Sequence, residues 1–289
     1  MADTSSSPIL DLAAVCLEVN DLDRASCFYE SLLGLSVTSR DDRDGRLELS
    51  LPNRQKLECW LPLTRRAAGG LLSDLGARGG VHLHFALQIP RGASDLARNA
   101  LRAHGLTWQE INLAEPDEEP DVGLYFYDPF GHGLELREVE TDRGDPRAPF
   151  TRVGIPSVRR FTLPVIGLRE IVLAFAGSPD TGRRLREAYG LAFLKESDER
   201  FFLQFALGAQ AKPDGRHTPQ RWLYAWDPQV GLAGMLPGEH VTARFLADLD
   251  ALRERLAASG LQTASGEDWL AARDTDGHVF HFIQPDAWE

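Results

Sequence analysis

The amino-acid sequence predicts an α+β protein built of four βαβββ modules, arranged as two tandem copies. The first observation is an internal repeat: "ILDLAAVCLEV" (9–19) aligns with "VIGLREIVLAF" (165–175), and the same offset brings Gly34 onto Gly190. The second is that each copy reads strand, helix and further strands twice in succession. The third is a turn before each last strand, "DPFGHG" in one copy and "DTDGH" in the other. Such self-similarity decides the fold class, because each repeat is one supersecondary unit.

The first module shows the pattern most clearly. "AAVCLEV" (13–19) alternates as a strand does, and "DLDRASCFYESLLG" (21–34) follows with an apolar stripe at helical spacing. The stripe consists of Ala25, Phe28, Tyr29, Leu32 and Leu33. Gly34 suits the position just after a helix, where glycine adopts a left-handed conformation without strain. "LELSLP" (47–52) and "KLECWLP" (56–62) then predict two strands.

The later modules repeat this order. The second has a strand at 81–89, a helix from about Ser94 to His104, and strands that end in "LYFYDPFGHGLELRE" (124–138). In the fourth, "LADLDALRERLAASG" (246–260) predicts a helix with one leucine-rich face. We predict an N-terminal domain at 8–140, a linker at 141–164 and a C-terminal domain at 165–289. The linker contains Pro146, Pro149, Pro156 and Pro164, which break regular structure.

Composition excludes several classes of partner. The net charge of −12 argues against nucleic acid and against anionic membrane surfaces. The N-terminal stretch lacks a basic region, and Asp11 and Glu18 interrupt its apolar run, so we expect neither a signal peptide nor a membrane span. Three cysteines without a CxxC motif fit a reducing compartment. We therefore expect a cytoplasmic protein whose partner is a small-molecule substrate or ligand.

The stretch "DPFGHGLEL" (128–136) places a carboxylate in an unusual setting. Asp-Pro followed by glycine predicts a tight turn, and a strand follows it. Alternate side chains of a strand point to opposite faces, so the two leucines share one face and Glu135 lies on the other. In the second copy, "DTDGHVFHF" (274–282) has His281 at this place. The repeat thus puts an ionisable side chain at one strand position in both copies.

With these motifs the chain resembles the vicinal oxygen chelate superfamily, which includes glyoxalase I, bleomycin resistance proteins and extradiol ring-cleaving dioxygenases. The resemblance covers nearly all residues outside the linker, and it implies tandem domains with cup-shaped mixed sheets. It also implies a divalent metal ion bound by Glu135 and by His82 of "GGVHLHFAL" (79–87). The spacing from Tyr125 to Glu135 is similar to that of the dioxygenases, in which this tyrosine lines the substrate pocket.

The third metal ligand has to come from elsewhere, because Ala14 stands where the family has a histidine. The repeat position of Ala14 is Glu170, whose strand neighbours are apolar on the other face. If the two copies exchange modules, Glu170 joins His82 and Glu135. We favour this arrangement because it keeps both residues that are typical of the family.

The alternative arrangement closes each copy on itself, and its ligand set is Glu170, His240 and His281. Both sets combine imidazole with carboxylate, which suits Fe(II), Mn(II), Zn(II) or Ni(II). If Glu170 is not a ligand, burial would raise its pKa and make it a candidate general base. Tyr125 is the second candidate catalytic residue, as a hydrogen-bond donor to the substrate.

These residues predict a metal-dependent enzyme of the glyoxalase or ring-cleaving dioxygenase type, acting on a small substrate with vicinal oxygens. The rival hypothesis is a metal-free small-molecule binding protein of the bleomycin-resistance type, with aromatic walls instead of a metal centre. Candidate wall residues are Trp60, Trp108, Trp222 and Trp226. A homodimer is compatible with either hypothesis.

Some of the same side chains also have ordinary structural interpretations. Arg137, two residues along the same strand face, could pair with Glu135. His84 should share the face of His82 and line the pocket. His132 and His278 lie in the two repeated turns, where we expect a surface position.

Overall fold

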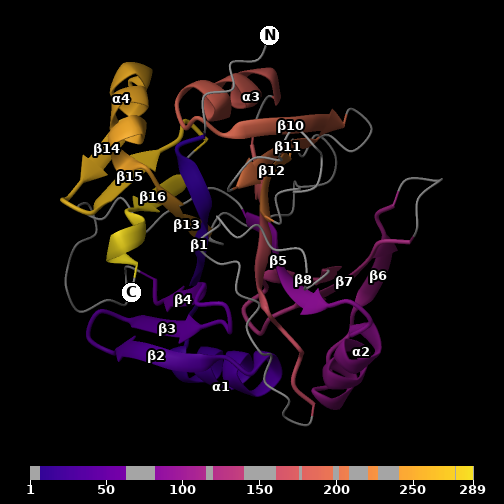
Figure 1. The fold of residues 1–289 in the computed structure, drawn as a ribbon. Helices are drawn as coiled ribbons and strands as arrows, with labels where there is room; N and C mark the ends of the chain where they lie inside the picture. Colours follow the sequence, from indigo (N-terminus) through magenta and orange to yellow (C-terminus); the bar gives the residue numbers. More distant parts are fainter. Residues whose placement is uncertain are drawn as a thin grey trace.

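The computed structural model describes residues 7–62, 82–114, 120–139, 161–175, 178–197, 202–207, 221–226, 241–276 and 278–288. Four modules follow one another along the chain, each with one helix and four strands (Figure 1). The first has β1 (Ile9–Glu18), α1 (Leu22–Leu33), β2 (Ser36–Asp41), β3 (Arg46–Ser50) and β4 (Lys56–Trp60). The second has β5 (His82–Pro90), α2 (Ser94–Ala103), β6 (Gln109–Asn112), β7 (Val122–Tyr127) and β8 (Gly133–Val139).

The second half of the chain repeats this order. The third module has β9 (Gly167–Ala174), α3 (Ser178–Glu187), β10 (Ala192–Ser197), β11 (Phe202–Leu207) and β12 (Arg221–Trp226). The fourth has β13 (Val241–Ala247), α4 (Leu249–Ser259), β14 (Gln262–Ser265), β15 (Trp269–Arg273) and β16 (Val279–Ile283). A short 3₁₀ helix, η3 (Pro285–Ala287), follows. The predicted α+β class with four βαβββ modules is therefore confirmed.

The modules combine in an exchanged arrangement. One eight-stranded sheet has the order β14-β15-β16-β13-β1-β4-β3-β2, and the other has β10-β11-β12-β9-β5-β8-β7-β6. We call them the β1/β13 sheet and the β5/β9 sheet after their central strands. In both, the central pair is antiparallel and each central strand has a parallel neighbour on its other side. The first module therefore shares a sheet with the last, and the two middle modules share the other. The domain boundaries 8–140 and 165–289 follow the sequence repeat and stay a prediction.

The helices begin and end where local chemistry favours it. The Asp21 carboxylate caps α1 by accepting from the backbone N–H of Arg24 at 2.9 Å. Gly34 ends the helix in a left-handed conformation with a φ of 66°. The Asp248 carboxylate and Gly260, with a φ of 73°, do the same for α4. These caps lie where the sequence predicted the helix boundaries.

The repeated turns connect the two sheets. After β7, the Tyr29 hydroxyl of α1 donates to Asp128 Oδ2 at 2.5 Å, and His132 Nε2 donates to the carbonyl of Glu18 at the end of β1, at 2.8 Å. In the second copy, His278 Nε2 donates at 2.6 Å to the carbonyl of Ala174 in β9. The expectation of surface histidines is wrong, because both side chains are buried and bind a backbone oxygen of the other sheet.

A continuous apolar core fills the space behind the sheets. Leu134 and Leu136 of β8 belong to it, as do Ile171 and Leu173 of β9. Strand alternation then forces Glu135 to the opposite face of its sheet. In the described part of the chain, no helix combines the length and the apolar character that crossing a membrane requires.

Candidate metal centre

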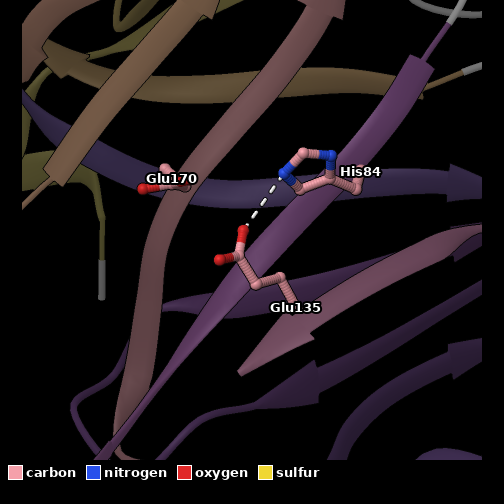
Figure 2. A group of neighbouring side chains, drawn as sticks. All are labelled: His84, Glu135 and Glu170. Carbon is pink, nitrogen blue, oxygen red and sulfur yellow. Dashed lines mark ion pairs between the residues drawn. The ribbon is translucent and has the colours of Figure 1, made fainter. Parts of the chain in front are cut away.

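Three neighbouring strands of the β5/β9 sheet bring His84, Glu135 and Glu170 together (Figure 2). The register explains the meeting, because Ala86 of β5 lies opposite Glu170 of β9 on one side and opposite Glu135 of β8 on the other. His84 is two residues along β5 and so shares the strand face of Ala86. One imidazole nitrogen and one oxygen of each carboxylate all lie within 4.8 Å of one another.

Glu135 is completely buried, with an exposed fraction of 0%. Its Oε1 accepts a hydrogen bond from Arg137 Nη1 at 3.0 Å. Its Oε2 lies within ion-pair distance of His84 Nε2, at 3.1 Å, but has no hydrogen-bond partner among the described residues. A buried carboxylate oxygen without a partner is costly, so its position beside an imidazole nitrogen suits a shared cation.

Room for this carboxylate depends on a glycine in the neighbouring strand. A Cβ atom added to Gly123 of β7 would lie 2.6 Å from Glu135 Oε1 and 2.8 Å from the Tyr125 ring. Any side chain at position 123 would therefore displace both groups.

Glu170 is also buried and forms an ion pair with Arg169, whose Nε lies 3.3 Å from its Oε2. Burial, followed by the negative charge of Glu135, raises the pKa of Glu170, although Arg169 and Arg137 oppose this shift. For Glu135, burial acts in the same direction, but His84 and Arg137 outweigh it and lower the pKa. The two carboxylates thus differ: Glu135 is held as an anion, whereas the charged form of Glu170 is disfavoured until a further cation approaches.

The cluster lies beside a cavity of about 560 Å³. His84, Tyr125, Arg137 and Glu170 line one part of it. The lining also includes four aromatic residues: Phe202, Trp222, Tyr224 and Trp226. Burial, and then the charge and hydrogen bond of Glu135, raise the pKa of Tyr125, so its hydroxyl remains protonated at neutral pH.

Most of the predicted site residues can be located. Glu135 and Glu170 meet as module exchange required, and the histidine beside them is His84, which had been expected only to line the pocket. The side chain of His82 and all of His240 lie outside the described residues, so roles for these two stay predictions. Arg137 does pair with Glu135, but inside the cavity, where it also binds Asp121.

The remaining candidates lie elsewhere. His281 belongs to the β1/β13 sheet, where its ring meets Trp60 edge-on at 6.4 Å. Trp108 stacks against Arg102 and donates to Glu110, away from the residues that line the cavity. Of the four tryptophans expected to form walls, only Trp222 and Trp226 line this cavity.

The donor set fits a divalent metal ion. Two carboxylates and one imidazole on adjacent strands are a composition that Fe(II), Mn(II) and related ions accept. Glu135 Oε2, which lacks a hydrogen bond to any described residue, and Glu170, whose charged form is disfavoured, would both gain from a cation between them. Among the described residues, this is the one group of three with such spacing.

Comparison with known proteins supports the architecture of four βαβββ modules described above. No family model matches the sequence. A "putative dioxygenase" from Bacillus subtilis superposes with a TM-score of 0.64 at 15% identity, covering 97% of this chain and 86% of that chain. Glyoxalase I from Zea mays superposes with a TM-score of 0.59 at 15% identity, covering 96% of this chain and 92% of that one. At these identities the likeness concerns the fold.

The tandem βαβββ modules, joined into two mixed sheets of eight strands, give the chain the same overall fold as these two proteins. A relative in sequence is the "Uncharacterized protein PA2024" of Pseudomonas aeruginosa, which is 30% identical over 142 residues. This match covers 91% of the relative but 48% of the present chain, so the relative corresponds in length to one of the two tandem copies.

Proposed function

We propose that the chain is a metal-dependent enzyme that acts on a small substrate with two vicinal oxygens. The observation that carries this proposal is the convergence of His84, Glu135 and Glu170, from three adjacent strands, beside a cavity of about 560 Å³. The likeness to a "putative dioxygenase" and to glyoxalase I supports it at the level of the fold. Because one fold serves many chemistries, the argument depends on the site.

His84, Glu135 and Glu170 would hold the ion, and a bound divalent ion supplies a Lewis acid that stabilises negative charge developing on a substrate oxygen. Two carboxylates favour harder ions, with Mn(II) and Fe(II) ahead of Zn(II) and Ni(II). Arg137 and Arg169 orient the carboxylates through their ion pairs, as groups behind metal ligands commonly do. The aromatic wall would bind an apolar part of the substrate and exclude water.

Within this class we favour ring cleavage of an aromatic vicinal diol. Tyr125 lies directly opposite Glu135 in the register of β7 and β8, and it lines the cavity. Its raised pKa keeps the hydroxyl as a donor, which can bind a substrate oxygen. Lyase or isomerase chemistry of the glyoxalase type is the alternative on the same centre.

One observation favours the rival, a metal-free binding protein. Each buried carboxylate already has an arginine partner, Arg137 for Glu135 and Arg169 for Glu170, so the centre has compensating charge without an ion. In such a protein the aromatic wall would supply the affinity and the ion pairs would be structural.

Metal analysis of protein purified without an affinity tag separates the two hypotheses. We expect about one transition-metal ion per chain, with Glu170→Ala and His84→Ala each losing it and His281→Ala retaining it as the control. Binding of metal by all three variants would contradict the assignment of the ligands. If the parent binds no metal but still binds aromatic compounds, the rival is correct.

A further inference from the structure

The charges around the cavity are balanced only while no metal ion is present. Among the described residues, Arg137, Arg169 and Lys195 contribute the cations that line it, and Asp121 and Glu170 line it as carboxylates. Glu135, buried between His84 and Arg137, supplies a third carboxylate. A divalent ion would therefore give the site an excess of positive charge. A largely buried site disfavours such an excess, so it favours an anionic substrate.

Lys195 is the cation available for this anion. Arg137 is engaged by Glu135 and Asp121, and Arg169 is engaged by Glu170. Lys195 is exposed and has no carboxylate within ion-pair distance in the described part of the chain. Its ammonium lies 5.9 Å from the centre of the Phe202 ring. It is therefore free to bind a group of the substrate at the mouth of the cavity.

The strand register places Lys195 and His84 on one row across the sheet. Lys195 of β10 lies opposite Gln204 of β11, which lies opposite Tyr224 of β12. Tyr224 lies opposite Val172 of β9, which lies opposite His84. All five residues line the cavity, so the row runs along its wall from the candidate metal centre to the lysine.

The length of this row limits the size of the substrate. Four inter-strand steps of about 4.8 Å separate the Cα atoms of Lys195 and His84 by roughly 19 Å along the sheet. Both residues line the cavity from the ends of this row. The row between them includes Tyr224, whose ring suits contact with a planar compound. The Gln204 amide, next to Lys195 in the row, donates to the hydroxyl of Tyr224 at its middle, at 2.6 Å.

We infer that the substrate is a carboxylated aromatic or similarly planar compound, whose carboxylate binds Lys195 while its vicinal oxygens reach the centre formed by His84, Glu135 and Glu170. This inference rests on the proposed function and adds the substrate class to it. Lys195 is a specificity residue here, because it binds the end of the substrate that does not react.

The test compares 3,4-dihydroxybenzoate with its methyl ester, which keeps the ring and both hydroxyls but replaces the carboxylate by a neutral ester. Binding is measured by calorimetry on the full chain loaded with Mn(II), without oxygen so that no turnover occurs. We expect the parent to bind the acid about 10-fold more tightly than the ester, as a charge-assisted hydrogen bond would provide. Lys195→Met should lose this preference without changing the affinity for the ester, and Lys195→Arg should keep it.

Arg183→Met is the matched control, because Arg183 is an exposed cation of α3 whose side chain is 63% exposed and lies away from the cavity. It should bind both compounds like the parent. Equal affinity of the parent for acid and ester, or an unchanged preference in Lys195→Met, would overturn the inference. Failure of the loaded parent to bind either compound would overturn it as well.

The same measurement on chelator-treated protein separates this inference from the proposed function. If both compounds bind equally well without metal, the metal-dependent function is wrong. A preference for the acid that still depends on Lys195 would then support the carboxylate site alone.

Discussion

The two sheets have the same topology, but their central positions hold different chemistry. In the β5/β9 sheet, Ala86 lies between Glu170 and Glu135, and its small side chain leaves the two carboxylates facing His84. The result is a group of ligand atoms with one unpartnered oxygen.

In the β1/β13 sheet, the central position holds a cation instead of a small side chain. Arg244 occupies the register position of Ala86, between Ala14 on β1 and His281 on β16. Its guanidinium lies 2.9 Å from the carboxylate of Glu58, which Trp60 also contacts through Nε1 at 3.3 Å. Where one sheet leaves space for a cation, the other has an arginine.

This difference shows how one duplicated framework can hold a candidate metal centre in one sheet and a structural ion pair in the other. A guanidinium is charged at every accessible pH, so it neutralises Glu58 permanently. A metal ion can leave, and the two carboxylates then depend on their ion pairs with Arg137 and Arg169. We therefore expect removal of a charged group to change the free energy of unfolding in the β1/β13 sheet and the metal affinity in the β5/β9 sheet.

The largest change in stability should come from removal of the Arg244 guanidinium. Arg244→Met should lower the free energy of unfolding by about 3 kcal/mol, because it leaves the largely buried Glu58 carboxylate without a counter-charge. Urea denaturation measures this value, and metal affinity should not change. The double variant Arg244→Met/Glu58→Gln should recover most of the loss, since it removes the orphaned charge. No recovery would mean that Arg244 stabilises the sheet by packing.

The matching arginine of the other sheet should act on metal affinity. Arg137→Met removes the hydrogen bond that orients Glu135, and loss of such a supporting group lowers metal affinity by about 10–100-fold. This factor corresponds to about 1.4–2.7 kcal/mol. Competition with a chelator of known affinity measures it. Equal effects of Arg137→Met and Arg244→Met on metal affinity would contradict the distinction between the two sheets.

A smaller change in stability, of opposite sign, is expected from substitution of Glu170. Its raised pKa means that the folded, metal-free protein disfavours the charged form at neutral pH. Glu170→Gln should therefore raise the free energy of unfolding of metal-free protein by roughly 1 kcal/mol, the usual gain when a functional constraint is relieved. With saturating metal the parent should be more stable than Glu170→Gln, since only the parent is stabilised by metal binding. A Glu170→Gln variant less stable than the parent under metal-free conditions would show that the Arg169 pair dominates.

The repeat in the sequence was sufficient to predict the module order and to bring Glu170 to Glu135. That prediction follows from the internal repeat in the sequence. Glu170 stands at the repeat position of Ala14, and only module exchange places it beside Glu135. The position of His84 beside the two carboxylates was not predictable in the same way. The pairing of β5 with β9 shifts register between His82 and His84, and alternation along a strand does not reveal such a shift.

The buried turn histidines are a second feature that the sequence did not predict. Turn residues are expected on the surface, and nothing local in "DPFGHG" or "DTDGH" predicts otherwise. His132 and His278 are buried because each reaches a backbone carbonyl in the opposite sheet, at Glu18 and at Ala174. Such partners are set by the packing of whole modules.

The last prediction concerns pH and the turn of the second copy. Burial lowers the pKa of His278 in the folded protein, although its hydrogen bond to Ala174 and the nearby acids oppose this shift. The unfolded chain has the ordinary histidine pKa of about 6.5. Between that value and the lower folded pKa, the unfolded state binds more protons, so stability should be complete above about pH 6.5 and decrease as the pH falls below it.

Urea denaturation at several pH values tests this prediction in the parent and in His278→Gln, whose amide can still donate to the carbonyl. The contribution of His278 to the slope should be at most about 1.4 kcal/mol per pH unit. His278→Gln should lose stability less steeply between about pH 6.5 and 5. Equal slopes for the two proteins would mean that His278 takes up its proton in the folded state as readily as in the unfolded chain. The burial of this turn would then impose no electrostatic cost.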